Sequence, residues 1–116
     1  MNISDIIAEF VLDLKNFLGK DLSSIILYGS YARGDYHLTS DVDVMVLVTL
    51  SDKEIKKIEN QIFDCAFDLE IKYGVDISPI IKNQEHYEYW VDTLPFYRNI
   101  QREGVTVAWR IKWEME

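Results

Sequence analysis

The chain has 116 residues, of which 48% are hydrophobic and 13% aromatic, and this composition predicts one globular domain over residues 1–116. Twelve Lys and Arg residues against twenty Asp and Glu residues give a net charge of −8, which excludes free nucleic acid as an expected partner because an acidic surface repels a phosphate backbone. The only cysteine, Cys65, allows no intrachain disulfide. The sequence contains neither a signal-peptide pattern nor an apolar run of membrane-spanning length. We therefore expect a cytoplasmic protein without a membrane partner.

The first fifty residues predict a helix followed by two strands. Apolar residues recur at helical spacing over residues 2–19, which indicates an amphipathic helix. Residues 23–28 are rich in Ile and Leu and predict a short strand. Residues 42–50 form a nearly continuous apolar run, typical of a strand covered on both faces, and Asp41 and Asp43 lie at its start. Charged residues at the start of a buried strand indicate either a cap or a functional site.

The remaining residues predict a long helix and then a less regular region. A capping-box pattern opens a helix over residues 51–73, and residues 75–81 predict a third strand. Asp76 lies near the start of this strand, and Pro79 indicates that the strand is at an edge or contains a bulge. Two shorter helices and a last strand are predicted at residues 83–91, 95–102 and 105–109. The predicted fold class is therefore α+β, with a small mixed sheet of about four strands covered by helices.

Three carboxylates are candidate catalytic residues and metal ligands. Asp41 and Asp43 are two apart in an extended segment, so their side chains leave the same face, about 6.5 Å apart along the chain. Asp76, on another predicted strand of the same sheet, is a candidate third ligand and a candidate acceptor for the proton of an incoming hydroxyl. Such oxygen ligands suit Mg²⁺, which would relieve their mutual repulsion.

A nucleotide-binding loop is predicted at Gly29 and Ser30. Glycine lets the backbone approach a ligand closely, and a helix that starts after it directs free N–H groups at a phosphate. Ser30 adds a hydroxyl donor, and Arg33 lies about one turn further, where its guanidinium can face the triphosphate or the leaving pyrophosphate. Gly29, Ser30 and Arg33 are therefore the candidate nucleotide-binding residues.

The pattern Gly-Ser-x-Ala-Arg-Gly-x5-Ser-Asp-x-Asp at residues 29–43 resembles the signature of the DNA polymerase beta-like nucleotidyltransferases in their minimal form, the MNT proteins. The resemblance implies a fold like the polymerase beta palm, with Gly29 and Ser30 gripping phosphate. It implies Asp41 and Asp43 as metal ligands, and Asp76 as third carboxylate and base. The implied reaction is attack by an acceptor hydroxyl on the α-phosphate of ATP or another NTP, with two Mg²⁺ ions as cofactors and release of pyrophosphate.

The resemblance also implies a partner. Larger members of the family carry a second domain that holds the acceptor, whereas minimal members are commonly paired with a small helical HEPN protein, a ribonuclease toxin. The implied function is that of an antitoxin in a HEPN/MNT toxin-antitoxin pair, a protein adenylyltransferase in which Asp76 activates a tyrosine hydroxyl of the partner. Two alternatives remain open, namely an antitoxin that masks its partner by contact with little catalysis, and a transferase acting on a small molecule such as an aminoglycoside.

Simpler explanations exist for several of these residues. Asp41 and Asp43 could cap a strand end, and Arg33 could pair with Asp35 on the surface, a contact worth at most about 1 kcal/mol. The C-terminal third is rich in aromatic residues, among them Trp109 and Trp113. These rings either pack within the fold or dock against a partner, which includes another copy of the chain in a homo-oligomer.

Overall fold

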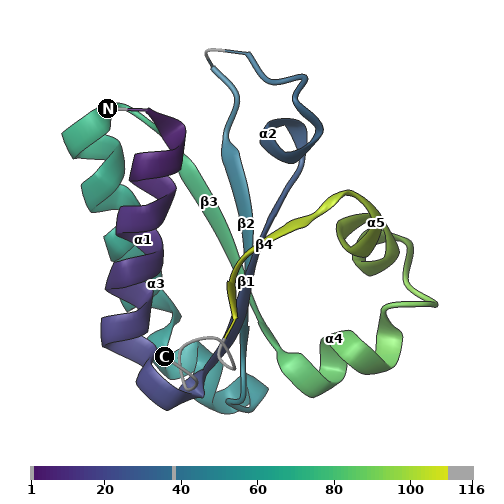
Figure 1. Cartoon of the computed structure of the whole chain (residues 1–116). Coiled ribbons are helices and arrows are strands. Elements are labelled where there is room, and N and C mark those ends of the chain that lie inside the picture. The colour runs from purple at the N-terminus through teal and green to yellow at the C-terminus, as the bar shows by residue number, and fades with distance from the viewer. Residues whose placement is uncertain (1, 38, 110–116) are drawn as a thin grey trace.

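A computed structural model describes residues 2–37 and 39–109 of the chain. In the described residues four strands form one sheet, with the order β3-β2-β1-β4 (Figure 1). β2 pairs in parallel with β3, and β1 pairs antiparallel with both β2 and β4. The bounds of the strands are β1 (Leu22–Tyr28), β2 (Val42–Val48), β3 (Ile77–Asn83) and β4 (Val105–Trp109). The predicted α+β fold with a mixed sheet is confirmed.

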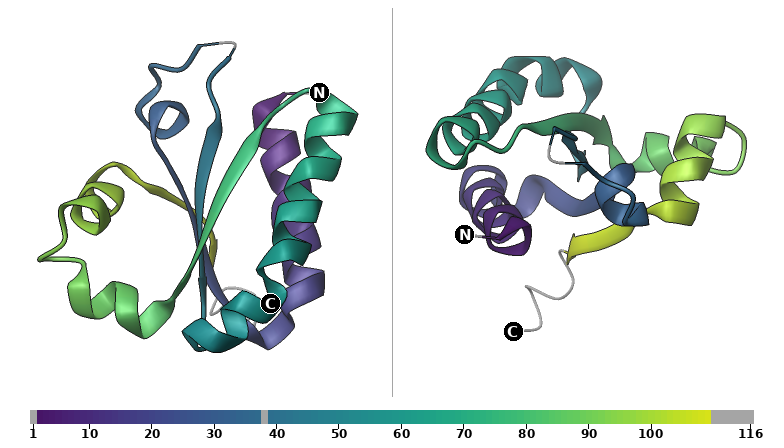
Figure 2. Two further views of the ribbon diagram at one scale, coloured as in Figure 1. Left: turned by 180° about the vertical axis from the view of Figure 1, so that it is seen from behind. Right: turned by 90° about the horizontal axis from the view of Figure 1, so that it is seen from above.

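Helices cover both faces of this sheet. α1 (Ile3–Leu18) and α3 (Asp52–Tyr73) lie side by side on one face, whereas α4 (Gln84–Trp90) and α5 (Pro95–Glu103) lie on the other (Figures 1 and 2). A single turn of 3-10 helix, η1 (Gly19–Asp21), leads into β1. The four-residue helix α2 (Ser30–Arg33) lies beyond the end of β1, apart from both helix layers.

Local signals in the sequence fix the ends of the two long helices. The side chain of Asn2 caps α1 by accepting a hydrogen bond of 2.9 Å from the backbone N–H of Asp5. Ser51 and Glu54 form the predicted capping box at the start of α3. Gly74 ends α3 in the left-handed conformation, with φ of 71°, as the predicted stop.

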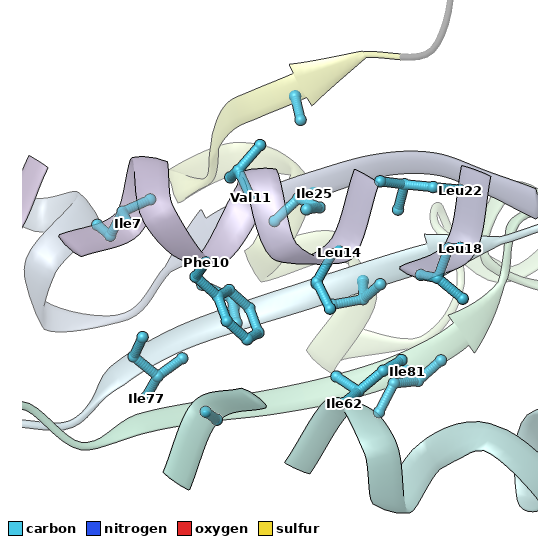
Figure 3. Close-up of a cluster of buried hydrophobic side chains, with 14 of the residues drawn as sticks. Ile7, Phe10, Val11, Leu14, Leu18, Leu22, Ile25, Ile62, Ile77 and Ile81 are labelled. Atoms are coloured by element: carbon cyan, nitrogen blue, oxygen red, sulfur yellow. The ribbon is translucent and has the colours of Figure 1, made fainter. Parts of the chain in front are cut away.

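Two hydrophobic cores lie on opposite faces of the sheet. The larger one joins α1, α3 and the sheet, and Figure 3 shows Phe10 and Leu14 of α1 pointing toward the strands. The smaller core lies under α4 and α5 and contains Met45, Leu47, Tyr87, Val91, Tyr97 and Ile100. β2 contributes to both cores, since its valines belong to the larger core and Met45 and Leu47 belong to the smaller one. This placement explains why the sequence of β2 is apolar without alternation.

Differences from the predicted elements are small and concern strand ends. β3 begins at Ile77, so Asp76 precedes the strand, because the backbone first pairs with β2 at the contact between Ile77 and Val42. Pro79 lies in an edge strand, as predicted. Within the part of the chain that the structure describes, no helix is both long and apolar enough to cross a bilayer.

Candidate active site

The three candidate carboxylates lie at one end of the sheet, where β1 ends and β2 and β3 begin. Tyr28, the last residue of β1, is paired with Asp43 of β2. On the other side of β2, Asp43 is paired with Ser78, and the backbone N–H of Val42 donates a 2.8 Å hydrogen bond to the carbonyl of Asp76. The strand pairing therefore brings residues distant in sequence to one edge of the sheet.

Gly29 is required by its position between β1 and α2. Its φ of 75° and ψ of −156° belong to a region that side chains rarely permit. A Cβ atom at this position would overlap the carboxylate of Asp43. The Gly-Ser turn thus lies directly against the second carboxylate of the Asp-x-Asp pair.

The turn after Gly29 opens a helix, as predicted, but this helix is a single turn. The backbone N–H of Arg33 donates to the carbonyl of Gly29 at 3.0 Å, and Gly34 ends the turn in the left-handed conformation. The first N–H groups of a helix have no partner within it. Ser30 therefore stands at the N-terminus of a short helix, directly after the glycine that lies against Asp43.

Electrostatic repulsion connects the carboxylates. The pKa of Asp43 is raised above its usual value by partial burial and by the negative charge of Asp41, while the charge of Arg33 acts in the opposite direction. The pKa of Asp76 is raised by partial burial, by the charge of Asp41 and by a hydrogen bond with the Asp41 side chain. Asp41 is thus close enough to influence both of the other carboxylates.

The donor set fits a hard divalent cation in its chemistry, since carboxylate oxygens that repel one another are stabilised by such an ion. The side chains, however, do not form a complete set of ligands as they are placed. Among the residues that the structure describes, no three His, Cys, Asp or Glu side chains stand close enough together to hold a metal ion. The structure therefore brings the carboxylates together in pairs through Asp41, and their role as metal ligands remains a prediction.

Arg33 forms two ion pairs at the edge of the site. Its Nε lies 3.2 Å from Oδ2 of Asp35, and its Nη1 lies 3.0 Å from Oε2 of Glu103 in α5. The surface pair with Asp35, considered above as the simpler explanation, is therefore present. The second pair connects α2 with α5, so the guanidinium bridges two elements that border the same cleft.

This cleft has a volume of about 440 Å³ and lies between α2, α5 and the ends of β1 and β2. It is lined by Tyr28, Gly29, Ser30, Arg33, Asp43, Phe96, Asn99, Ile100 and Glu103. Burial and the charge of Asp43 raise the pKa of Tyr28 to about 12, so its hydroxyl stays protonated at neutral pH. A larger groove of about 580 Å³ between α1 and β4 contains none of the predicted site residues. The smaller cleft is therefore the candidate active site.

Sequence reasoning did not assign the α5 residues Phe96, Asn99 and Glu103 to this site. They come from the C-terminal part of the chain and reach the cleft only because α5 packs over the sheet beside α2. The available signal was their spacing of three and four residues, which places them on one face of a predicted helix. The side chains of Trp109 and Trp113, for which packing or partner contacts are predicted, lie outside the part that the structure describes.

Comparison with known proteins identifies the family of the chain. The sequence model of the family described as "Nucleotidyltransferase domain" matches residues 6–105. The chain belongs to this nucleotidyltransferase family. The chain is also 40% identical over 101 residues to a protein of Methanocaldococcus jannaschii named "Putative protein adenylyltransferase MJ0141". The matched region covers 84% of this nucleotidyltransferase and 96% of the relative.

Solved structures share the fold of this nucleotidyltransferase at low sequence identity. A crystal structure described as a "putative nucleotidyltransferase" from Sulfolobus solfataricus superposes with a TM-score of 0.64 and 17% identity, over 93% of this chain and 81% of the other. A crystal structure described as a toxin-antitoxin with AMP-PNP gives a TM-score of 0.54 and 19% identity, over 91% of this chain and 77% of the other. These likenesses support the expected polymerase-beta-like fold.

Proposed function

We propose that this nucleotidyltransferase transfers AMP from ATP to a hydroxyl group of a partner protein. The observation that carries the proposal is the contact of the Gly29 turn with Asp43 inside a cleft that Ser30 and Arg33 also line. Phosphate-binding groups and carboxylates must adjoin in this way for a triphosphate to bind together with its counter-ion. The name of the relative from Methanocaldococcus jannaschii supports a protein as the acceptor.

The residues of the chain have separate roles in this reaction. Gly29, Ser30 and Arg33 bind the triphosphate, and Asp76 accepts the proton of the acceptor hydroxyl. The acceptor oxygen forms a bond to the α-phosphorus, the bond from this phosphorus to the oxygen bridging to the β-phosphate breaks, and pyrophosphate leaves. Asp41, Asp43 and Asp76 would hold Mg²⁺, expected as two ions, which when bound neutralises the charge of the triphosphate.

The proposed partner is a small helical HEPN-type toxin, with this chain as its cytoplasmic antitoxin. A solved structure described as a toxin-antitoxin with AMP-PNP has the same fold, which supports an adenine nucleotide as substrate and a toxin as partner. The net charge of −8 also favours a protein acceptor over free nucleic acid.

Mass spectrometry of the purified chain, mixed with ATP, Mg²⁺ and its co-purified partner, tests the proposal. The partner is expected to gain the mass of one AMP group. Asp41→Asn and Asp43→Asn should abolish this gain, because each removes a carboxylate from the site. Asp64→Asn makes the same chemical change on an exposed part of α3 and should preserve the gain. No added nucleotide on either protein would contradict the proposed transfer.

Toxin neutralisation in cells separates transfer from simple masking. Variants carrying Asp41→Ala and Asp43→Ala should fold and bind the partner but fail to neutralise it, since the reaction cannot proceed. Neutralisation at the level of the unchanged chain would mean that contact alone is sufficient. That result would reject the antitoxin mechanism proposed here.

A further inference from the structure

One wall of the active-site cleft is formed by α5, a helix that supplies none of the residues assigned to phosphate binding. Phe96, Asn99 and Glu103 line the cleft from this helix, opposite the turn at Gly29 and Ser30. Because their spacing is three and four residues, their side chains lie along one face of α5. The helix rises by about 10 Å between Phe96 and Glu103, which gives the wall room for one nucleoside alongside it.

The position of this wall is fixed at both of its ends. At the C-terminal end, Gly104 packs so closely on β1 that a Cβ atom would overlap the Ile100 carbonyl and a methyl group of Ile26. The ion pair of Glu103 with Arg33 then connects the wall to α2. At the other end, the Phe96 ring meets the Tyr28 ring edge to face, with centroids 5.9 Å apart. The wall is therefore positioned before any ligand binds.

The two ends of the wall differ in chemistry. The guanidinium beside Glu103 marks the phosphate end, next to Ser30 and Asp43. The opposite end presents Phe96, a residue that is 46% exposed and therefore available for contact. Between the two ends the exposed side-chain amide of Asn99 has no hydrogen-bond partner within residues 2–37 and 39–109. An aromatic ring beside a free amide is suited to a nucleobase.

We propose that α5 selects the base of the nucleotide, with Phe96 stacking on the base and the Asn99 amide forming hydrogen bonds to its edge. This inference rests on the proposed function, because it assigns the nucleoside part of the same substrate. The favoured base is adenine, since an amide can donate to one edge atom of adenine and accept from its amino group. Guanine offers two acceptors at the same edge, which leaves the amide oxygen without a donor.

Substitution of the amide by an apolar side chain tests the assignment. Asn99→Leu removes both the donor and the acceptor, so ATP loses two hydrogen bonds and GTP loses one. ATP binding should therefore weaken relative to GTP binding by about tenfold, the scale of one paired contact between an amide and a base. Gln101→Leu also replaces an amide by an apolar side chain on the same helix, at a residue that does not line the cleft. This control should leave the ATP to GTP ratio unchanged.

Substitution of the ring tests the stacking contact. Phe96→Leu should weaken ATP and GTP to a similar extent, by about tenfold, because stacking does not depend on the identity of the base. Phe67→Leu is the matched control, since Phe67 is an exposed ring of α3 outside the cleft. The binding of inorganic tripolyphosphate, which lacks a nucleoside, should be the same in all of these variants.

Isothermal titration of ATP, GTP and tripolyphosphate at one Mg²⁺ concentration gives all of these values. Equal ATP to GTP ratios in the unchanged chain and in Asn99→Leu, with tripolyphosphate still bound, would overturn the α5 assignment and leave the proposed function intact. Absence of binding for both ATP and tripolyphosphate would overturn the proposed function and this inference together.

Discussion

Gly29 links backbone conformation to the chemistry of the site. Alanine at this φ and ψ costs on the order of 1–3 kcal/mol of strain, and its Cβ must also displace the Asp43 carboxylate. Gly19→Ala is a suitable control, because Gly19 also has a positive φ but has open space where a Cβ would lie. We expect Gly29→Ala to abolish Mg²⁺-dependent nucleotide binding in a calorimetric titration and Gly19→Ala to retain it. Equal binding by the two variants would show that the close approach to Asp43 is unimportant.

Whether the sequence predicted that two residues share the site depended on how far apart they lie along the chain. The Gly-Ser turn and Asp43 are separated by a short segment, and the motif that contains both indicated that they belong to one site. Asn99 and Glu103 reach the same cleft only through the packing of α5 beside α2, which no local pattern encodes. Arg33 was assigned to the nucleotide, but its partner Glu103 could not be foreseen for the same reason.

Helices α1 and α3 are joined by a charged contact whose strength depends on pH. Oε2 of Glu9 accepts a 2.6 Å hydrogen bond from the Tyr73 hydroxyl, and Oε1 of Glu9 lies 3.0 Å from the Lys72 ammonium. The Tyr73 hydrogen bond and then that of Lys72 lower the pKa of Glu9 below its usual value. A lowered pKa stabilises the folded state at neutral pH, and this contribution is lost as the pH falls through the folded pKa.

Glu9→Gln is therefore expected to lower the urea midpoint at pH 7 and to differ progressively less from the unchanged chain as the pH falls below about 4, where an ordinary glutamate becomes protonated. Glu70→Gln removes a charge from an exposed position of α3 for which no side-chain contact is found in the described residues. Its effect should be smaller at pH 7. A Glu9→Gln deficit that persists unchanged at acidic pH would mean that the charge of Glu9 is not the cause.

At the scale of elements the sequence was informative because helix ends carry their own signals. The capping box at Ser51 and the stop at Gly74 gave the bounds of α3. The start of β3 was less well predicted, since strand bounds depend on a partner strand. The pairing of β3 with β2 begins only at Ile77. Asp76 consequently lies in the segment before the strand, where its backbone carbonyl still bonds to β2.

The strand order and the helix layers were not predictable from the sequence. The apolar run of β2 indicated burial on both faces, but nothing local states that β1 lies between β2 and β4 or that α1 and α3 share a face. This arrangement separates two tasks. One layer supplies most of the buried apolar core, and the opposite face carries the cleft.

Leu14→Ala tests this separation of stability from binding. Leu14 is fully buried in the larger core, so its truncation should lower the free energy of unfolding by about 2–5 kcal/mol in a urea titration. Leu12→Ala makes the same substitution on the same helix at a side chain that is 56% exposed, and should change it by less than about 0.5 kcal/mol. Under conditions in which both variants are folded, their affinity for Mg²⁺-ATP should equal that of the unchanged chain. A loss of affinity in folded Leu14→Ala would mean that the α1 layer also holds the cleft in shape, because β1, which leads into Gly29, and β2, which carries Asp43, are packed directly on it.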